Sequence, residues 1–356
     1  MNIGEARALA REWVVAHMAA RPGFRGAYLS GSAAASAPED PLARDSDVDV
    51  RVVWEGSASP DFGFGKRIYR GSVLDVSHMN EGDLASPERV LTDYHLAHPF
   101  GTRGPILADP AGLIGRLQEA IAPRFDERFW VAQRVAHALS TVERHLDALD
   151  GTGSWPTEVM AWLFATGVTA HVILVAALQN PTVRRRYVAL NGVLEGLGLG
   201  RHHGEFLALL GSDAWTPDQA LRHLGALTWV FDQTARLPRP PFPFSADISP
   251  WGRPMAIDGS RGLIRQGFHR ESAFWMLVTF ARCQQILESS EEIGLRRRAA
   301  SGFREILADI GITDRTDLVS RAVQVRRFRP ALEGLADGVM IRRASAGRRP
   351  RGPTST

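Results

Sequence analysis

The sequence predicts an α+β protein, in which a mixed β-sheet with flanking helices forms the N-terminal domain and an all-α helical bundle follows. Over residues 1–125, short apolar runs bounded by Gly, Ser and Pro alternate with amphipathic segments, as expected for strands and helices in one layered domain. Over residues 126–237, the helical patterns are long and nearly uninterrupted. With 356 residues, of which 44% are hydrophobic and 23% charged, the chain is long enough for two globular domains with buried cores.

The N-terminal domain is predicted to open with an amphipathic helix, because apolar residues recur at helical spacing between Ile3 and Val14. Charged residues are interleaved through this segment, unlike in a signal peptide, so we expect a cytoplasmic protein. Ser86, followed by Glu88, predicts the capped start of a later helix. The further elements expected here are strands within residues 25–30, 45–54, 66–79 (one strand or a bent pair) and 104–110, and helices within residues 86–98 and 111–121.

The bundle is predicted from long helical patterns within residues 128–149, 159–178, 181–198 and 216–237. The second of these has no Asp, Glu, Lys or Arg and has the length of a membrane span. It contains Thr166, Thr169 and His171, and no second span or signal accompanies it, so we interpret it as a central helix of the bundle. Residues 238–340 are expected to form a proline-rich linker with a C-terminal helical extension, and residues 341–356 a disordered basic tail.

The composition excludes some kinds of site. The single cysteine, Cys283, excludes an intramolecular disulfide and a cysteine-cluster zinc site, and its apolar helical surroundings predict a buried, inert thiol. The basic residues are almost all arginine, since Lys66 is the only lysine, which indicates a compositional bias rather than a guanidinium selected at each position. Part of the excess positive charge lies in the tail, where a solvated end is favoured over a nucleic-acid-binding segment, so nucleic-acid binding is not expected.

The most informative stretch is residues 29–54, where an apolar strand leaves through Gly31–Ser32 and a second strand returns with Asp45, Asp47 and Asp49. Carboxylates are poor strand residues and repel one another, so a strand that carries them is expected to hold something positive. Alternate residues of a strand share a face, so these carboxylates are predicted to point one way while the intervening valines pack on helices.

A third carboxylate repeats this arrangement on a later strand. Leu74 and Val76 are predicted to face the core, which turns Asp75 to the opposite side. If the two strands are neighbours, Asp47, Asp49 and Asp75 can converge. Clustered carboxylates on rigid strands are suitable ligands for Mg²⁺, and a substrate's phosphates complete the coordination shell.

The Gly31–Ser32 turn complements such a site. A glycine lets backbone N–H groups approach a phosphate closely, and the small residues that follow predict a short helix with its positive dipole end at the turn. Gly31–Ser32, Asp47-Val48-Asp49-Val50 and Asp75 together resemble the motif of the nucleotidyltransferase superfamily that includes DNA polymerase beta, and most closely its aminoglycoside and lincosamide nucleotidyltransferases. The bundle after the catalytic domain is also similar, so the resemblance covers residues 1 to about 235. The gap at residues 33–46 is at the long end of the family's pattern.

The resemblance implies that Asp47 and Asp49 hold one or two Mg²⁺ ions on the phosphates of ATP or another nucleoside triphosphate, and that Gly31–Ser32 cradle the outer phosphates. Asp75 would either ligate the second metal or take the proton from the attacking hydroxyl. The implied reaction moves a nucleoside monophosphate, AMP above all, onto a hydroxyl of a small molecule such as an antibiotic or other natural product, and releases pyrophosphate. A transferase acting on protein or RNA, or a non-catalytic nucleotide- or ligand-binding module, is the alternative.

In similar transferases a basic residue of the bundle contacts the triphosphate. Arg185, within the run of arginines at residues 184–186, and Lys66 are candidates for that contact, although a solvated helix face would carry the same arginines. Eleven acids and nine arginines lie within residues 126–237, so the bundle is nearly neutral. Because a polycationic acceptor would favour a clear acidic excess, we expect an acceptor with few positive charges.

Overall fold

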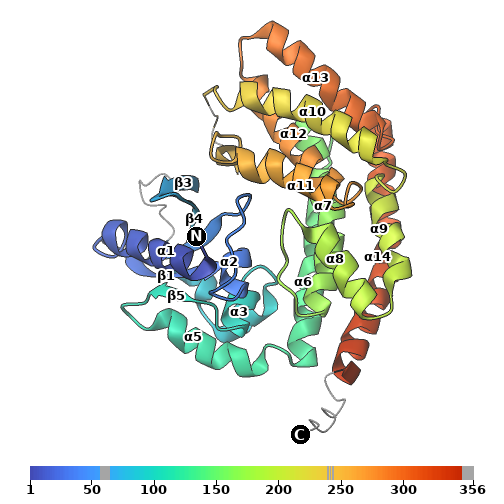
Figure 1. Cartoon of the computed structure of the whole chain (residues 1–356). Coiled ribbons are helices and arrows are strands. Elements are labelled where there is room, and N and C mark those ends of the chain that lie inside the picture. Colours follow the sequence, from blue (N-terminus) through green and yellow to red (C-terminus); the bar gives the residue numbers. More distant parts are fainter. Residues whose placement is uncertain (57–64, 239, 241, 243, 347–356) are drawn as a thin grey trace, which may run out of the picture.

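The structure is a computed structural model, and it describes residues 1–56, 65–238, 240, 242 and 244–346 (Figure 1). A five-stranded mixed sheet forms the N-terminal part and helices form the rest, which confirms the predicted α+β class. The sheet order is β3-β4-β2-β1-β5; β2 and β4 are parallel, and the other neighbouring pairs are antiparallel. The strands are β1 (Phe24–Ser30), β2 (Val48–Trp54), β3 (Gly65–Tyr69), β4 (Ser72–Asn80) and β5 (Ile106–Ala108).

Separate hydrophobic clusters cover the two faces of the sheet. Val48, Val50 and Val52 of β2 are fully buried in a cluster with helix α1, as the alternation predicts. Tyr28 and Val53 belong to the cluster on the opposite face, with helices α3 and α5. The helices of this part are α1 (Ile3–His17), α2 (Gly31–Ala35), η1 (Glu81–Leu84), α3 (Pro87–Thr92), α4 (Ala97–Gly101), α5 (Leu113–Ile121) and η2 (Ala122–Arg124). Burial on both faces places β2 at the centre of a layered domain.

Local sequence signals account for several element boundaries. Residues 66–79 form the bent pair rather than one strand, because Arg70 and Gly71 both have positive φ (47° and 85°) in the two-residue turn that joins β3 to β4. The hydroxyl of Ser86 accepts a hydrogen bond from the backbone N–H of Arg89, which confirms the predicted cap of α3. The short helix expected after Gly31 is α2.

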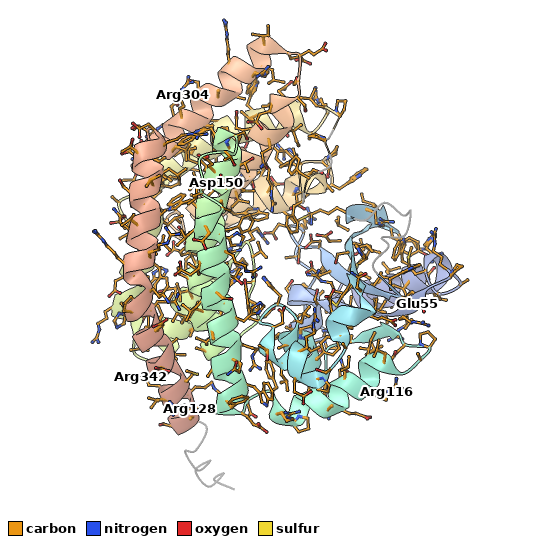
Figure 2. The ribbon with its side chains drawn as sticks, turned by 180° about the vertical axis from the view of Figure 1, so that it is seen from behind. Glu55, Arg116, Arg128, Asp150, Arg304 and Arg342 are labelled. Carbon is orange, nitrogen blue, oxygen red and sulfur yellow. The ribbon has the colours of Figure 1, made fainter. Side chains whose placement is uncertain are left out.

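The helices after residue 125 pack around α7 (Trp155–Ala176), which contacts α6, α8, α12 and α14. Figure 2 shows α6 running from Arg128 at one end of the helical part towards Asp150 near the other. One hydrophobic core contains residues from both sides of the proline-rich segment, so the helices within residues 126–237 and those after residue 238 share a core. The elements are α6 (Arg128–Asp147), α7, α8 (Arg186–Gly196), η3 (Gly200–His202), α9 (His203–Leu210), α10 (Pro217–Thr234), η4 (Ser245–Asp247), the π-helix η5 (Pro254–Asp258), α11 (Gly259–Arg265), α12 (Ala273–Glu288), α13 (Ile293–Ala308) and α14 (Arg315–Ala346).

Helix α7 contains the uncharged segment that has the length of a membrane span. Of the described residues, this helix is the one long and apolar enough to cross a membrane, and 89% of its most apolar window is buried inside the protein. The apolar side chains therefore face the protein interior, as expected for a central helix of a bundle.

Two boundaries differ from the sequence-based expectation. Strand β2 begins at Val48, so Asp45 and Asp47 lie in the loop before it rather than on the strand. Helix α14 continues through residues 341–346, although the composition predicts a disordered tail from residue 341 onwards. Buried Val339 and Met340 hold this end of the helix against the core, which a reading of charge alone does not capture. Residues 347–356 of the predicted tail lie outside the described residues.

Candidate functional site

The parallel pairing of β2 with β4 brings the predicted carboxylates together. Its register places Asp49 of β2 directly beside Asp75 of β4, and Asp47 immediately precedes β2. Leu74 and Val76, which flank Asp75, are buried in the core on the other face of the sheet. Because β2 and β4 are neighbouring strands, Asp47, Asp49 and Asp75 converge.

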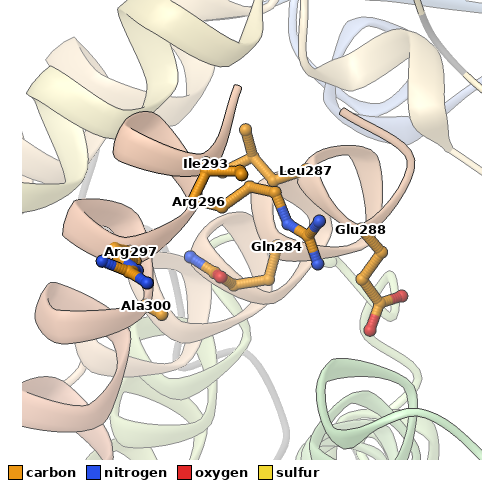
Figure 3. A pocket seen from close by; sticks show the side chains of 7 residues that line it. All are labelled: Gln284, Leu287, Glu288, Ile293, Arg296, Arg297 and Ala300. Carbon is orange, nitrogen blue, oxygen red and sulfur yellow. The ribbon is translucent and has the colours of Figure 1, made fainter. Parts of the chain in front are cut away.

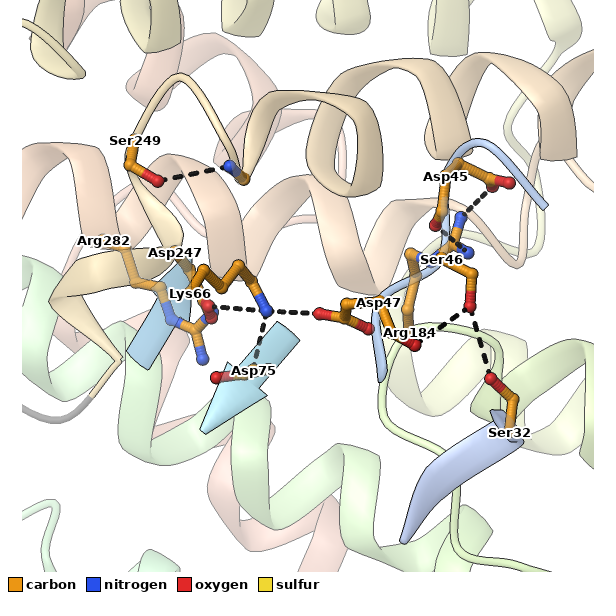
Figure 4. Close-up of polar contacts among 11 residues, drawn as sticks. Ser32, Asp45, Ser46, Asp47, Lys66, Asp75, Arg184, Asp247, Ser249 and Arg282 are labelled. Carbon is orange, nitrogen blue, oxygen red and sulfur yellow. Dashed lines mark hydrogen bonds and ion pairs between the residues drawn. The ribbon is translucent and has the colours of Figure 1, made fainter. Parts of the chain in front are cut away.

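Lys66 lies at the centre of this acidic cluster. Strand β3 pairs Lys66 with Asp75, and the Lys66 Nζ lies 2.5 Å from Asp47 Oδ2 and 2.7 Å from Asp75 Oδ2 (Figure 4). The lysine side chain is only 8% exposed. Burial alone would lower the pKa of Lys66, but Asp47, Asp247 and Asp75 raise it well above its ordinary value, so the amine is held in its charged form.

The surroundings of Asp49 disfavour the ionised form of its carboxyl group. Its pKa is raised to about 7, first by burial and then by repulsion from Asp47 and Asp75. Burial also raises the pKa of Asp75, although the Lys66 ammonium opposes that shift. Further positive charge near Asp49 would therefore stabilise its ionised form.

Gly31 fits against Asp49 and leaves no room for a side chain. Gly31 directly follows the last residue of β1 and has a φ of +66°. A Cβ built on it would overlap the Asp49 carboxylate. The next residue, Ser32, lies in the first turn of α2, and its Oγ lies 3.3 Å from Ser46 Oγ in the loop that leads to Asp47. The predicted Gly-Ser turn therefore borders the carboxylates directly.

The helical part contributes a fourth carboxylate, which sequence reasoning missed. Asp247, at the end of η4, places its Oδ1 3.3 Å from Lys66 Nζ, and its Oδ2 accepts a hydrogen bond of 2.5 Å from the Arg282 guanidinium on α12 (Figure 4). Arg282 is 3% exposed and lies 5.3 Å from the Trp275 ring centroid. Asp247 follows the proline-rich segment without any local motif, so nothing near it in the sequence indicates this position.

A second polar link joins the loop before Asp47 to the helical part. Arg184 Nη1 donates to Asp45 Oδ2 at 2.6 Å, and its Nη2 donates to the Asp45 backbone carbonyl at 2.9 Å (Figure 4). Of the neighbouring arginines, Arg185 is exposed, while Arg186 is buried with its guanidinium 4.0 Å from the Phe274 ring centroid. Arg184 therefore reaches the N-terminal domain, and the contact of Arg185 with a triphosphate stays a prediction.

The donor set suits a hard cation such as Mg²⁺. Its ligands would be carboxylate oxygens on strands β2 and β4 and in the loop just before β2, and a cation, the Lys66 ammonium, already lies between Asp47 and Asp75. As the side chains stand in the described part of the chain, no three His, Cys, Asp or Glu residues form a group ready to hold a metal. A metal at this position would require Lys66 to move.

A cavity of about 390 Å³ lies apart from these carboxylates, between α12 and α13 (Figure 3). It is lined by Gln284, Leu287, Glu288, Ile293, Arg296, Arg297 and Ala300. Glu288 is its one carboxylate, and the cavity has neither paired acids nor a glycine turn. We therefore place the candidate site at Asp47, Asp49 and Asp75, on the side of the sheet where β2 begins, and call this region the sheet edge.

Comparisons of the chain with protein-family models, with curated proteins and with solved structures give no match. The functional assignment below rests on the residues and geometry of the sheet edge.

Proposed function

We propose that the protein is a Mg²⁺-dependent nucleotidyltransferase of the cytoplasm, which moves AMP from ATP onto a hydroxyl of a small molecule and releases pyrophosphate. The observation that supports this most is the register of the parallel β2–β4 pair, which sets Asp49 beside Asp75 with Asp47 at the same edge. The Gly31–Ser32 turn against Asp49 adds the place for a phosphate.

Each residue has a defined part in this reaction. Asp47 and Asp49 would hold Mg²⁺, which supplies Lewis-acid stabilisation of the charge that develops on the phosphates. Gly31 and Ser32 would bind the outer phosphates through backbone N–H groups and the Ser32 hydroxyl. Asp75 would accept the proton of the acceptor hydroxyl; if Asp75 instead ligates a second metal, the proton passes to water. The hydroxyl oxygen then forms a bond to the α-phosphorus as the bond to the bridging oxygen breaks, and pyrophosphate leaves.

The acceptor would lie where the sheet edge meets the helical part. Asp247 and Arg282 form an ion pair at this junction, and so do Asp45 and Arg184. The helical part thus offers matched charges rather than an uncompensated acidic surface, which favours an acceptor with few positive charges. A neutral sugar or a nucleoside-like hydroxyl compound fits this description better than a polyamine antibiotic.

The test is to replace a proposed metal ligand without disturbing the fold. Asp47→Asn or Asp49→Asn should reduce turnover by roughly a thousandfold, because a lost metal ligand removes several kcal/mol of transition-state stabilisation at about 1.4 kcal/mol per decade. Asp337→Asn, at an exposed position of α14, is the matched control and should keep wild-type activity. Pyrophosphate release from Mg²⁺–ATP would be measured over a panel of hydroxyl compounds that includes aminoglycosides, with thermal melts to verify folding. Near-normal turnover in either site variant would refute the metal assignment.

A non-catalytic nucleotide-binding module on the same fold is the second candidate. The ion pairs of Lys66 with Asp47 and Asp75 favour it, because they place a positive charge between two carboxylates without a metal. Such a module would bind ATP, as calorimetry can measure, yet release no pyrophosphate with any acceptor. Turnover only with a protein or RNA acceptor would keep the transferase assignment and change the substrate class.

A further inference from the structure

We propose that Lys66 is a built-in counter-ion, whose ammonium occupies oxygens of Asp47, a proposed Mg²⁺ ligand, and of Asp75, and must leave them when Mg²⁺ and nucleotide bind. This inference rests on the proposed function, and it adds a competition between a side chain and the metal. The cost of removing the ammonium would make the metal bind weakly to the protein alone.

The contacts of Lys66 define the position. One nitrogen atom lies within 2.7 Å of carboxylate oxygens from both Asp47 and Asp75, so it bridges the loop before β2 and strand β4. The side chain is 8% exposed, and its register partner is Asp75 itself, so strand pairing directs it across the acidic face. Two cations cannot share these oxygens at such distances without strong repulsion.

The presence of lysine rather than arginine at position 66 favours a side-chain cation that can move. Lys66 is the only lysine among 42 lysines and arginines, so this position departs from an otherwise complete use of arginine. An ammonium is a compact point charge on a flexible stem, whereas a guanidinium is a planar fork that binds carboxylates in fixed geometry. Arg282, held by Asp247, is an example of the fixed kind a short distance away.

Asp247 provides the ammonium with a second partner. It lies 3.3 Å from Lys66 Nζ and belongs to the helical part, so it need not be a ligand of the metal. Arg282 keeps the Asp247 carboxylate in place through its other oxygen. A small rotation of the lysine side chain towards Asp247 would free the oxygens of Asp47 and Asp75 and leave the ammonium beside the incoming phosphates.

The first experiment compares metal affinity in the absence of nucleotide. Lys66→Met should bind Mn²⁺ or Mg²⁺ about tenfold more tightly than the wild type or better, because a competing unit charge is removed from between the ligands. Arg70→Met is the matched control, since it removes a positive charge from the same hairpin at a residue whose side chain is 64% exposed and paired with Glu12. Its metal affinity should stay within about twofold of the wild type. Equal or weaker metal binding by folded Lys66→Met would overturn the inference.

A second measurement needs no substitution, in case Lys66→Met folds poorly. Protein grown with ¹³C-lysine carries a single labelled side chain, so its Cε resonance reports on Lys66 alone. The resonance should shift on saturation with Mg²⁺ and a non-hydrolysable ATP analogue. An unchanged resonance while calorimetry shows both binding would overturn this inference and leave the proposed function standing. If neither the wild type nor Lys66→Met binds metal or nucleotide, both proposals fail.

Discussion

Replacing Gly31 by alanine tests the arrangement of the site through a single added methyl group. Gly31 has a φ of +66°, and a Cβ at this residue would overlap the Asp49 carboxylate. Alanine would therefore strain the backbone and also push Asp49 aside. The two effects can be separated, because Gly198, between α8 and η3, has a φ of +68° but open space where its Cβ would lie.

The magnitudes follow from these two effects. A left-handed backbone costs an alanine roughly 1–2 kcal/mol, which at an unfolding entropy of about 2.1 cal/mol/K per residue lowers the melting temperature of this chain by about 1–3 °C. Both variants should show that loss. Only Gly31→Ala should also displace the Asp49 carboxylate, by about 1 Å or more, and a misplacement of about 1 Å can reduce turnover about a hundredfold.

The assay pairs thermal melting with pyrophosphate release and with calorimetric binding of Mg²⁺–ATP. Gly31→Ala should lose most turnover and weaken nucleotide binding, whereas Gly198→Ala should melt earlier but keep wild-type function. If Gly31→Ala bound nucleotide and turned over like the wild type, the close approach of Gly31 to Asp49 would have no role in the reaction.

Three further predictions concern the surroundings of the site. Arg184→Ala should leave the Asp45 carboxylate unpaired and loosen the loop that carries Asp47; we expect weaker Mg²⁺–ATP binding by calorimetry, and unchanged affinity would count against a positioning role. Because the pKa of Asp49 is raised to about 7, its contribution to stability is full below about pH 4 and is lost as the pH rises through 7. The melting temperature of the metal-free wild type should therefore fall relative to Asp49→Asn between pH 5 and 8, and parallel curves would contradict this. Leu163→Asp, at the fully buried centre of α7, should unfold the protein, as circular dichroism would show; recovery of folded wild-type protein only from membranes would reverse our interpretation of α7.

Much of the N-terminal domain could be predicted because its signals are local. Alternation in β2 and β4 assigned the buried valines and the outward carboxylates, and Ser86 marked the start of a helix. The third carboxylate, Asp75, could be identified because its two neighbours are apolar on a recognisable strand. These features depend on residues a few positions apart, which a sequence shows directly.

The remainder of the site depends on packing between distant segments. No local pattern indicates that Asp247 meets Lys66, or that Arg282 is the buried arginine beside it. The choice among the arginines at residues 184–186 is set by how α8 begins and by which side chain faces the loop at Asp45. Such contacts appear only once the two parts of the chain are placed together.

The junction of the sheet with the helical part has a consequence for biosynthesis. At roughly 5–20 residues per second, about 8–30 seconds of translation separate the end of the sheet domain from the synthesis of Arg282. During that interval Lys66 can pair with Asp47 and Asp75 but not with Asp247. Asp45 can pair with Arg184 only after that residue is synthesised. The acidic cluster of the nascent domain thus has Lys66 as a basic partner, while Arg184 and Arg282 are still to be synthesised. A chain interrupted before α12 carries the three strand-edge carboxylates without the Arg282 that holds Asp247 in place.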